Sequence, residues 1–100
     1  MIDAPIWTHL HEHSETRSER HHGDQDIPVA WAIEAWQDPL AALLDPDPKS
    51  KTSQSIRLIG WSESAGHLIT IIAVRFNGDL YAASAWKSNQ RDGHIYQQED

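Results

Sequence analysis

The dipeptide Asn77-Gly78 is the feature that most restricts the fold of this chain. Both residues tolerate the positive φ angles of a two-residue hairpin turn, and the flanking segments, Leu68–Phe76 and Leu80–Lys87, have the composition of β-strands. A similar segment, Ile56–Ser62, precedes them and is joined to them by the loop Glu63–His67. Because Leu68–Phe76 is apolar on both faces, it is expected to be the central strand. The second half of the chain therefore predicts a three-stranded antiparallel meander.

Two helices are predicted next to these strands. Apolar residues recur at helical spacing between Pro28, which suits a first helical turn, and Asp38-Pro39, which ends a helix. After the last strand, Ser88 or Asn89 is expected to cap a short helix over about Gln90–Gln98. One helix is therefore expected before the strands and one after them.

The remaining segments are less regular. Residues 1–26 are polar and His-rich, and a helix over about Ile6–His22 would have only a thin apolar stripe. Leu40–Leu44 is predicted to form a buried turn or a short strand, and Asp45–Ser55 an exposed loop. The chain is expected to be a single α+β domain over residues 1–100. Its predicted order is helix, helix, three strands, helix, with the helices on one side of an antiparallel sheet.

Composition and charge exclude several classes of protein. The chain has no Cys, so disulfides and thiolate ligands are excluded, and it has no apolar run long enough to cross a membrane, so a cytoplasmic location is the default expectation. The net charge of −7 arises in residues 1–50, which carry three basic and ten acidic side chains. Between Lys49 and Arg91 the balance reverses, with six basic and two acidic side chains. Acidity argues against general nucleic-acid binding and leaves room for a specific basic site.

A series of short motifs lies along most of the chain: His22-Gly23, Asp38-Pro39-Leu40, Asp45-Pro46-Asp47, Arg57, Gly60 before a hairpin, and the closing run Ser84–Asp92 followed by Tyr96. In their order and spacing, these motifs resemble the BrnT-type toxin family. The resemblance covers about residues 20–98, and Trp86 stands where family members usually have Arg. It implies a RelE-like fold and a metal-independent endoribonuclease without a cofactor. Such a toxin cleaves RNA and is neutralised by a cognate antitoxin protein.

RNA cleavage without a metal needs a base for the ribose 2′-hydroxyl, a cation for the phosphorane and an acid for the leaving 5′-oxygen. We expect Lys87 and Arg91 to contact the phosphate, because both lie where a strand passes into a helix. Arg57 is expected to stabilise the charge of the transition state, and His22 to transfer a proton. Replacing Lys87 or Arg91 by Ala is expected to slow cleavage by roughly ten- to a thousandfold.

Arg75, Trp86 and Tyr96 are further candidates for RNA binding. Plainer roles stay open for most of the catalytic and binding candidates. Arg57 and Arg75 could be solvated residues of strand edges, and His22 could bond the last carbonyls of a helix. Tyr96 could be a half-buried packing residue with a hydrated hydroxyl. Trp86 could be a platform for a base or a contact between copies of the chain, so the sequence leaves a homodimer open.

The hairpin register predicts which of these side chains share a face of the sheet. The turn at Asn77-Gly78 places Arg75 opposite Leu80, and alternation along the last strand then puts Trp86 on the face of Arg75 and Lys87 on the other. A β-bulge in the strand would reverse this arrangement.

His9, His11 and His13 form a second constellation, for which no complete set of metal ligands is evident. No metal site is therefore predicted.

The alternative function is a catalytically silent RelE-like module that binds or regulates another protein. The two functions differ in the surface that they need. An enzyme needs its basic residues to converge in a concave patch about one phosphate wide, whereas a binding module can scatter them.

Overall fold

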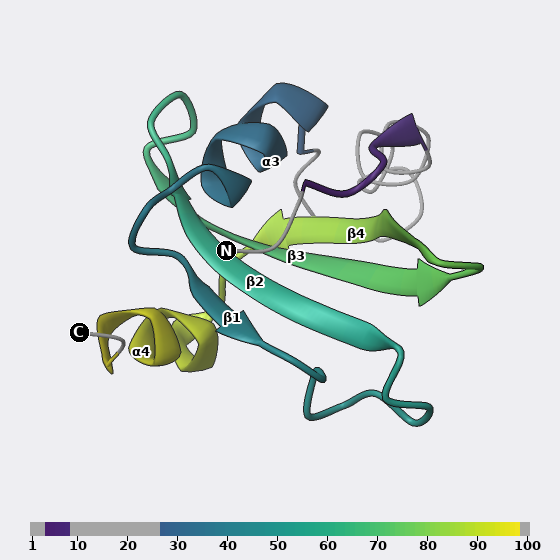
Figure 1. The fold of residues 1–100 in the computed structure, drawn as a ribbon. Helices are drawn as coiled ribbons and strands as arrows, with labels where there is room; N and C mark the ends of the chain where they lie inside the picture. The colour runs from purple at the N-terminus through teal and green to yellow at the C-terminus, as the bar shows by residue number, and fades with distance from the viewer. Residues whose placement is uncertain (1–3, 9–26, 99–100) are drawn as a thin grey trace, which may run out of the picture.

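The computed structural model describes residues 4–8 and 27–98 (Figure 1). In chain order they form α3 (Val29–Trp36), β1 (Ala42–Leu44), β2 (Ser55–Ser62), β3 (His67–Phe76), β4 (Asp79–Lys87) and α4 (Gln90–Gln98). The strands make one antiparallel sheet of order β1-β2-β3-β4. The predicted α+β class and the meander are confirmed, and the segment Leu40–Leu44 supplies an additional edge strand. The helix predicted over Ile6–His22 lies largely outside the described residues, but its first residue, Ile6, forms a β-bridge with Tyr81 of β4 and is not helical.

Both predicted helices near the sheet are present, and local signals explain their ends. α3 ends at Trp36, just before Asp38-Pro39, as predicted. α4 covers Gln90–Gln98, and the side-chain Oδ1 of Asn89 accepts a hydrogen bond of 2.9 Å from the backbone N–H of Asp92. Asn89 is therefore the N-cap, since its side chain satisfies an N–H that the first helical turn leaves free.

The prediction that the helices lie on one side of the sheet is wrong, because α3 and α4 cover opposite faces (Figure 1). Side chains of α3 pack against one set of alternating strand residues, which we call the α3 face: Ile56, Leu58, Ile69, Ile71, Ala73, Ala82 and Ala85. The other set, the α4 face, includes Arg57 and Thr70, which contact Asp92 of α4. The sheet is therefore a central layer with one helix on each face.

A glycine allows the close approach of α3 to the sheet. A Cβ atom at Gly60 of β2 would lie 2.0 Å from the carbonyl oxygen of Ala35, so a side chain there would collide with the helix backbone. Three Trp residues, Trp7, Trp31 and Trp36, also contact this core. The resulting layer of α3 against β2 and β3 is the main hydrophobic core of the described residues.

The register of the β3–β4 hairpin agrees with the prediction near the turn and departs from it farther along. Arg75 pairs with Leu80, as expected, but the register shifts between Ile72 and Ala73, and Ala83 has no partner in β3. Beyond this bulge, Trp86 pairs with Thr70 on the α4 face and Lys87 pairs with Ile69 on the α3 face. The predicted faces of Trp86 and Lys87 are therefore wrong, because one extra residue exchanges the two sides of a strand.

Within the described part of the chain, neither helix has the length and apolar character required to span a membrane.

Candidate functional site

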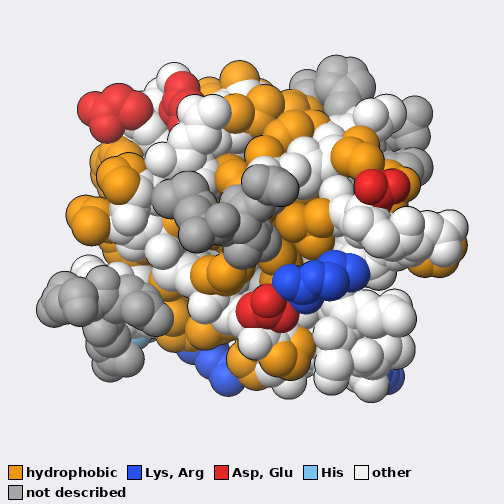
Figure 2. Space-filling model, in the orientation of Figure 1, with side chains coloured by type: hydrophobic (Ala, Val, Ile, Leu, Met, Phe, Trp, Pro, Cys, Tyr) orange, Lys and Arg blue, Asp and Glu red, His pale blue; other side chains and the backbone are white. Residues whose placement is uncertain are grey.

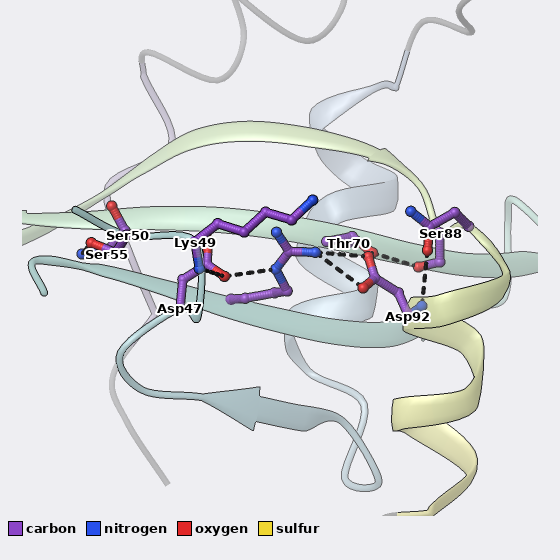
Figure 3. A network of polar contacts seen from close by, with 9 residues as sticks. Asp47, Lys49, Ser50, Ser55, Thr70, Ser88 and Asp92 are labelled. Carbon is purple, nitrogen blue, oxygen red and sulfur yellow. Dashed lines mark hydrogen bonds and ion pairs between the residues drawn. The ribbon is translucent and has the colours of Figure 1, made fainter.

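Arg57 of β2 is the centre of a buried polar network on the α4 face (Figure 3). Its Nε donates to Oδ1 of Asp47 at 3.1 Å, and its Nη1 donates to both carboxylate oxygens of Asp92 at 3.0 and 3.1 Å. Asp47 lies in the loop between β1 and β2, and Asp92 lies in the first turn of α4. The guanidinium therefore joins the loop, the sheet and the last helix.

Two hydroxyl groups extend this network toward the end of β4. Thr70 donates to Oδ2 of Asp92 at 2.7 Å, and its oxygen lies 2.7 Å from the hydroxyl of Ser88. Because the single hydroxyl proton of Thr70 is used on Asp92, Ser88 must be the donor to Thr70. The chain of bonds thus runs from Ser88 through Thr70 and Asp92 to Arg57. Every buried side-chain nitrogen and oxygen of the described residues has a partner.

Part of the Arg57 guanidinium is still available for a ligand. A guanidinium has five N–H donors, and the bonds to Asp47 and Asp92 use Nε and Nη1. The two donors of Nη2 make no hydrogen bond to a residue that the structure describes, and Nη2 is not a buried unpaired atom. Arg57 can therefore offer two further N–H groups to an anion without breaking its existing bonds.

A small hollow lies beside this guanidinium. Its lining residues are Leu44, Asp47, Pro48, Lys49, Arg57, Arg91, Asp92 and Ile95, and its volume of about 20 Å³ is enough for one water molecule. Lys49 and Arg91 are exposed at its rim, and Figure 3 shows the Lys49 side chain extending over the network. Three cations and two carboxylates meet here, which leaves one net positive charge.

Trp86 lies next to Arg57 on the α4 face. The guanidinium carbon of Arg57 is 5.8 Å from the centre of the indole ring, within the range of a cation–π contact. The β-bulge at Ala83 brings about this contact, since without it Trp86 would lie on the other side of the sheet. The structure thus places Arg57, Arg91 and Trp86, three of the predicted site residues, in one region.

Lys87 does not join this group. It is the last residue of β4, is exposed, and pairs with Ile69, which is fully buried in the core under α3. Paired residues share a face, so the Lys87 side chain lies on the α3 face, opposite to Arg57. Lys87 and Arg91 both lie at the junction of β4 and α4, as expected. Their side chains, however, lie on different faces of the sheet.

Arg75 is also separate from the hollow. Its Nη1 and Nη2 donate to the two oxygens of Asp45 at 3.0 and 2.7 Å, and both side chains are exposed. The hydrogen bond from Arg75 lowers the pKa of Asp45. On the surface seen in Figure 2, Lys and Arg side chains form small separate areas rather than one continuous patch.

Tyr96 is held by a different carboxylate. Its hydroxyl donates to Oδ2 of Asp38 at 2.6 Å, and Asp38 also accepts the backbone N–H groups of Leu40 and Trp61, both at 2.9 Å. Burial, the hydrogen bond to Asp38 and the charge of Asp38 together raise the pKa of Tyr96 to about 12. Tyr96 therefore joins α4 to the loop before β1.

Two predictions lie outside the described residues, namely the proton-transfer role of His22 and the His9–His13 segment. Among residues 4–8 and 27–98, no three His, Asp or Glu side chains are grouped so that they could hold a metal ion.

Sequence reasoning missed five residues of the site: Asp47, Lys49, Thr70, Ser88 and Asp92. A signal for Asp92 was present, since it lies in the first turn of the predicted last helix, next to the predicted site residue Arg91. Asp47 and Lys49 lie in a loop whose path the sequence does not specify.

No family model, no curated protein and no solved structure matches this chain.

Proposed function

We propose that this chain is the toxin of a toxin–antitoxin pair, a cytoplasmic, metal-independent endoribonuclease that binds RNA at the exposed rim of the hollow beside Arg57. The observation that carries the proposal is the meeting of Lys49, Arg57 and Arg91 at one hollow with a net charge of +1. One phosphodiester, with its single negative charge, would balance that charge. Trp86 adds an aromatic surface next to the cations, an arrangement that suits a stacked base.

The charge of the whole chain is compatible with this proposal. The described residues carry six Lys or Arg and seven Asp or Glu, so most of the net charge of −7 belongs to residues 1–3, 9–26 and 99–100. Local charge within about one Debye length, roughly 8–10 Å at physiological salt, determines how a phosphate is held. A nearly neutral body with a positive hollow meets that requirement.

The proposed reaction is attack of the ribose 2′-oxygen on phosphorus, with loss of the 5′-oxygen. A base removes the 2′-proton, an acid returns a proton to the leaving oxygen, and the products carry a 2′,3′-cyclic phosphate and a 5′-hydroxyl. The two Nη2 donors of Arg57 and the guanidinium of Arg91 would hold the phosphorane oxygens, and Lys49 would add positive charge. His22 is retained as the proposed proton-transfer group, and the cognate antitoxin as the partner.

A second candidate is the catalytically silent protein-binding module. It is favoured by the two carboxylates on Arg57, which already compensate the charge of that cation. Such a bonded network can be a purely structural device that joins a loop, a sheet and a helix.

The distinguishing experiment is an RNA cleavage assay in EDTA with the purified full-length chain, together with a growth test on induced expression. The double variant Lys49→Ala/Arg91→Ala, purified in parallel, controls for contaminating nucleases. Cleavage by the wild type that is lost in the double variant, with cyclic phosphate ends on the products, supports the enzyme. Absence of both cleavage and growth inhibition in the wild type supports the binding module.

A further inference from the structure

A second surface, at the C-terminal end of β2, combines exposed apolar side chains with acidic side chains. Leu40 is 67% exposed and Trp61 is 42% exposed. The backbone N–H groups of Leu40 and Trp61 both bind the carboxylate of Asp38, which brings the two residues close together. We call this the Trp61 surface, which comprises Leu40, Trp61 and three surrounding carboxylates, those of Glu34, Asp38 and Glu63.

These three carboxylates are held by neutral donors only. Glu34 accepts hydrogen bonds from Ser62 and Ser64, and Glu63 accepts one of 3.0 Å from the indole Nε1 of Trp61. Within the described ranges, none of the three forms an ion pair with Lys or Arg. In contrast, Asp45, Asp47 and Asp92 each bind an Arg. The negative charge at this end of the molecule is therefore not compensated by any Lys or Arg among the described residues.

The space-filling view agrees with this division. In Figure 2, Asp or Glu side chains adjoin hydrophobic side chains at the corner where Figure 1 places the β2–β3 turn, and no Lys or Arg side chain is visible there.

We infer that the Trp61 surface docks a segment of another protein in which an apolar side chain is flanked by Lys or Arg. Leu40 and Trp61 would contact the apolar side chain, and exposed Trp is a frequent anchor of protein interfaces. The three carboxylates would attract the basic flanks and increase the association rate. A second copy of this chain fits poorly, because a symmetric contact would bring two sets of uncompensated carboxylates together.

The Trp61 surface and the hollow lie on different sides of α4. Arg91 and Ile95 line the hollow, whereas Tyr96 binds Asp38 at the Trp61 surface. None of the residues of the Trp61 surface belongs to the hollow. The docking inference therefore does not depend on RNA cleavage, and either can fail without the other.

The test uses a short amphipathic helical peptide of Leu and Lys as the probe, with a Leu and Glu peptide of the same pattern as its control. Binding is followed by NMR of the ¹⁵N-labelled full chain through the indole N–H signals of its five Trp residues, with Trp61→Phe to assign one of them. The variant Leu40→Ser removes an exposed apolar contact. Its matched control is Phe76→Ser, since Phe76 is 61% exposed but lies roughly 25 Å away along β3.

The Lys peptide is expected to shift the Trp61 indole signal, and Leu40→Ser or Glu63→Lys to weaken binding about tenfold, while Phe76→Ser binds as the wild type does. Unchanged melting temperatures will show that both Ser variants are folded. Three results overturn the inference: no binding of the Lys peptide, equal binding of the Glu peptide, or equal losses in Leu40→Ser and Phe76→Ser. A shift of the Trp61 signal with protein concentration alone would instead identify a second copy as the occupant.

Discussion

Arg57 and Trp86 lie on the same face of the sheet, with the guanidinium carbon of Arg57 5.8 Å from the centre of the Trp86 ring. The contact exists because Ala83 is unpaired and exchanges the two sides of β4 beyond it. It places an aromatic ring beside a guanidinium whose Nη2 makes no bond to a described residue. The buried bonds to Asp47 and Asp92 hold Arg57 in this position.

Asp92→Asn is expected to destabilise the fold by about 3 kcal/mol. Asp92 is fully buried and accepts bonds from Arg57 and Thr70, so removing its charge leaves the guanidinium only partly compensated. Asp79→Asn is the matched control, because Asp79 is exposed at the hairpin, and it is expected to change stability by less than about 0.5 kcal/mol. Urea unfolding of both variants measures the difference. Equal stabilities would show that the network contributes little.

Two glycine substitutions are expected to have opposite signs. Gly60→Ala would place a Cβ 2.0 Å from the backbone oxygen of Ala35, so α3 must move and stability should fall by about 3 kcal/mol. Gly93→Ala lies inside α4, where the nearest atom is 4.0 Å away, and should raise stability by about 0.5–1 kcal/mol. Thermal unfolding of the two variants tests the packing of both helices. A stable Gly60→Ala variant would contradict the close approach of α3.

The hydroxyl of Tyr96 is expected to ionise late. Its pKa in the folded state is raised to about 12 from the usual 10, so the contribution of this group to stability is complete below pH 10 and is lost as the pH rises through about 12. Ultraviolet titration of the chain, which has two Tyr residues, should show a late step that disappears in Tyr96→Phe. That variant should also lose about 1 kcal/mol of stability at neutral pH. A Tyr96→Phe variant with the same late step would contradict the bond to Asp38.

The contribution of Asp38 to the stability of the fold is expected to change with pH in the acidic range. Burial acts to raise its pKa, but the bonds from Tyr96, Leu40 and Trp61 outweigh burial, so the pKa falls below the usual 3.8. A lowered pKa stabilises the fold above pH 3.8, and this stabilisation is lost as the pH falls through the lower folded value. The difference in the free energy of unfolding between the wild type and Asp38→Asn should therefore become smaller below about pH 4. A constant difference from pH 7 to pH 2 would exclude this linkage.

Local sequence signals predicted much of the fold. The turn at Asn77-Gly78 fixed the pairing of Arg75 with Leu80, and the cap at Asn89 fixed the start of α4. The bulge at Ala83 could not be predicted, because an extra Ala cannot be recognised in the polar and apolar alternation of a strand that is rich in small residues. The faces of Trp86 and Lys87 depend on that bulge.

The candidate site was predicted in part. Arg57 and Arg91 were singled out and do line one hollow, but their carboxylate partners come from a loop and from a helix whose placement depends on tertiary packing. The side of the sheet that α4 covers likewise depends on contacts with distant residues, among them the bonds of Asp92 to Arg57 and of Tyr96 to Asp38.

The most direct test of the proposed RNA site compares Arg91→Ala with Lys87→Ala in the cleavage assay in EDTA. Both residues are exposed cations at the junction of β4 and α4, but only Arg91 lines the hollow, since Lys87 lies on the α3 face. Cleavage is expected to fall by roughly ten- to a thousandfold in Arg91→Ala and to stay within about twofold of the wild type in Lys87→Ala. Equal rates in all three proteins, or a larger loss in Lys87→Ala, would contradict RNA binding on the α4 face.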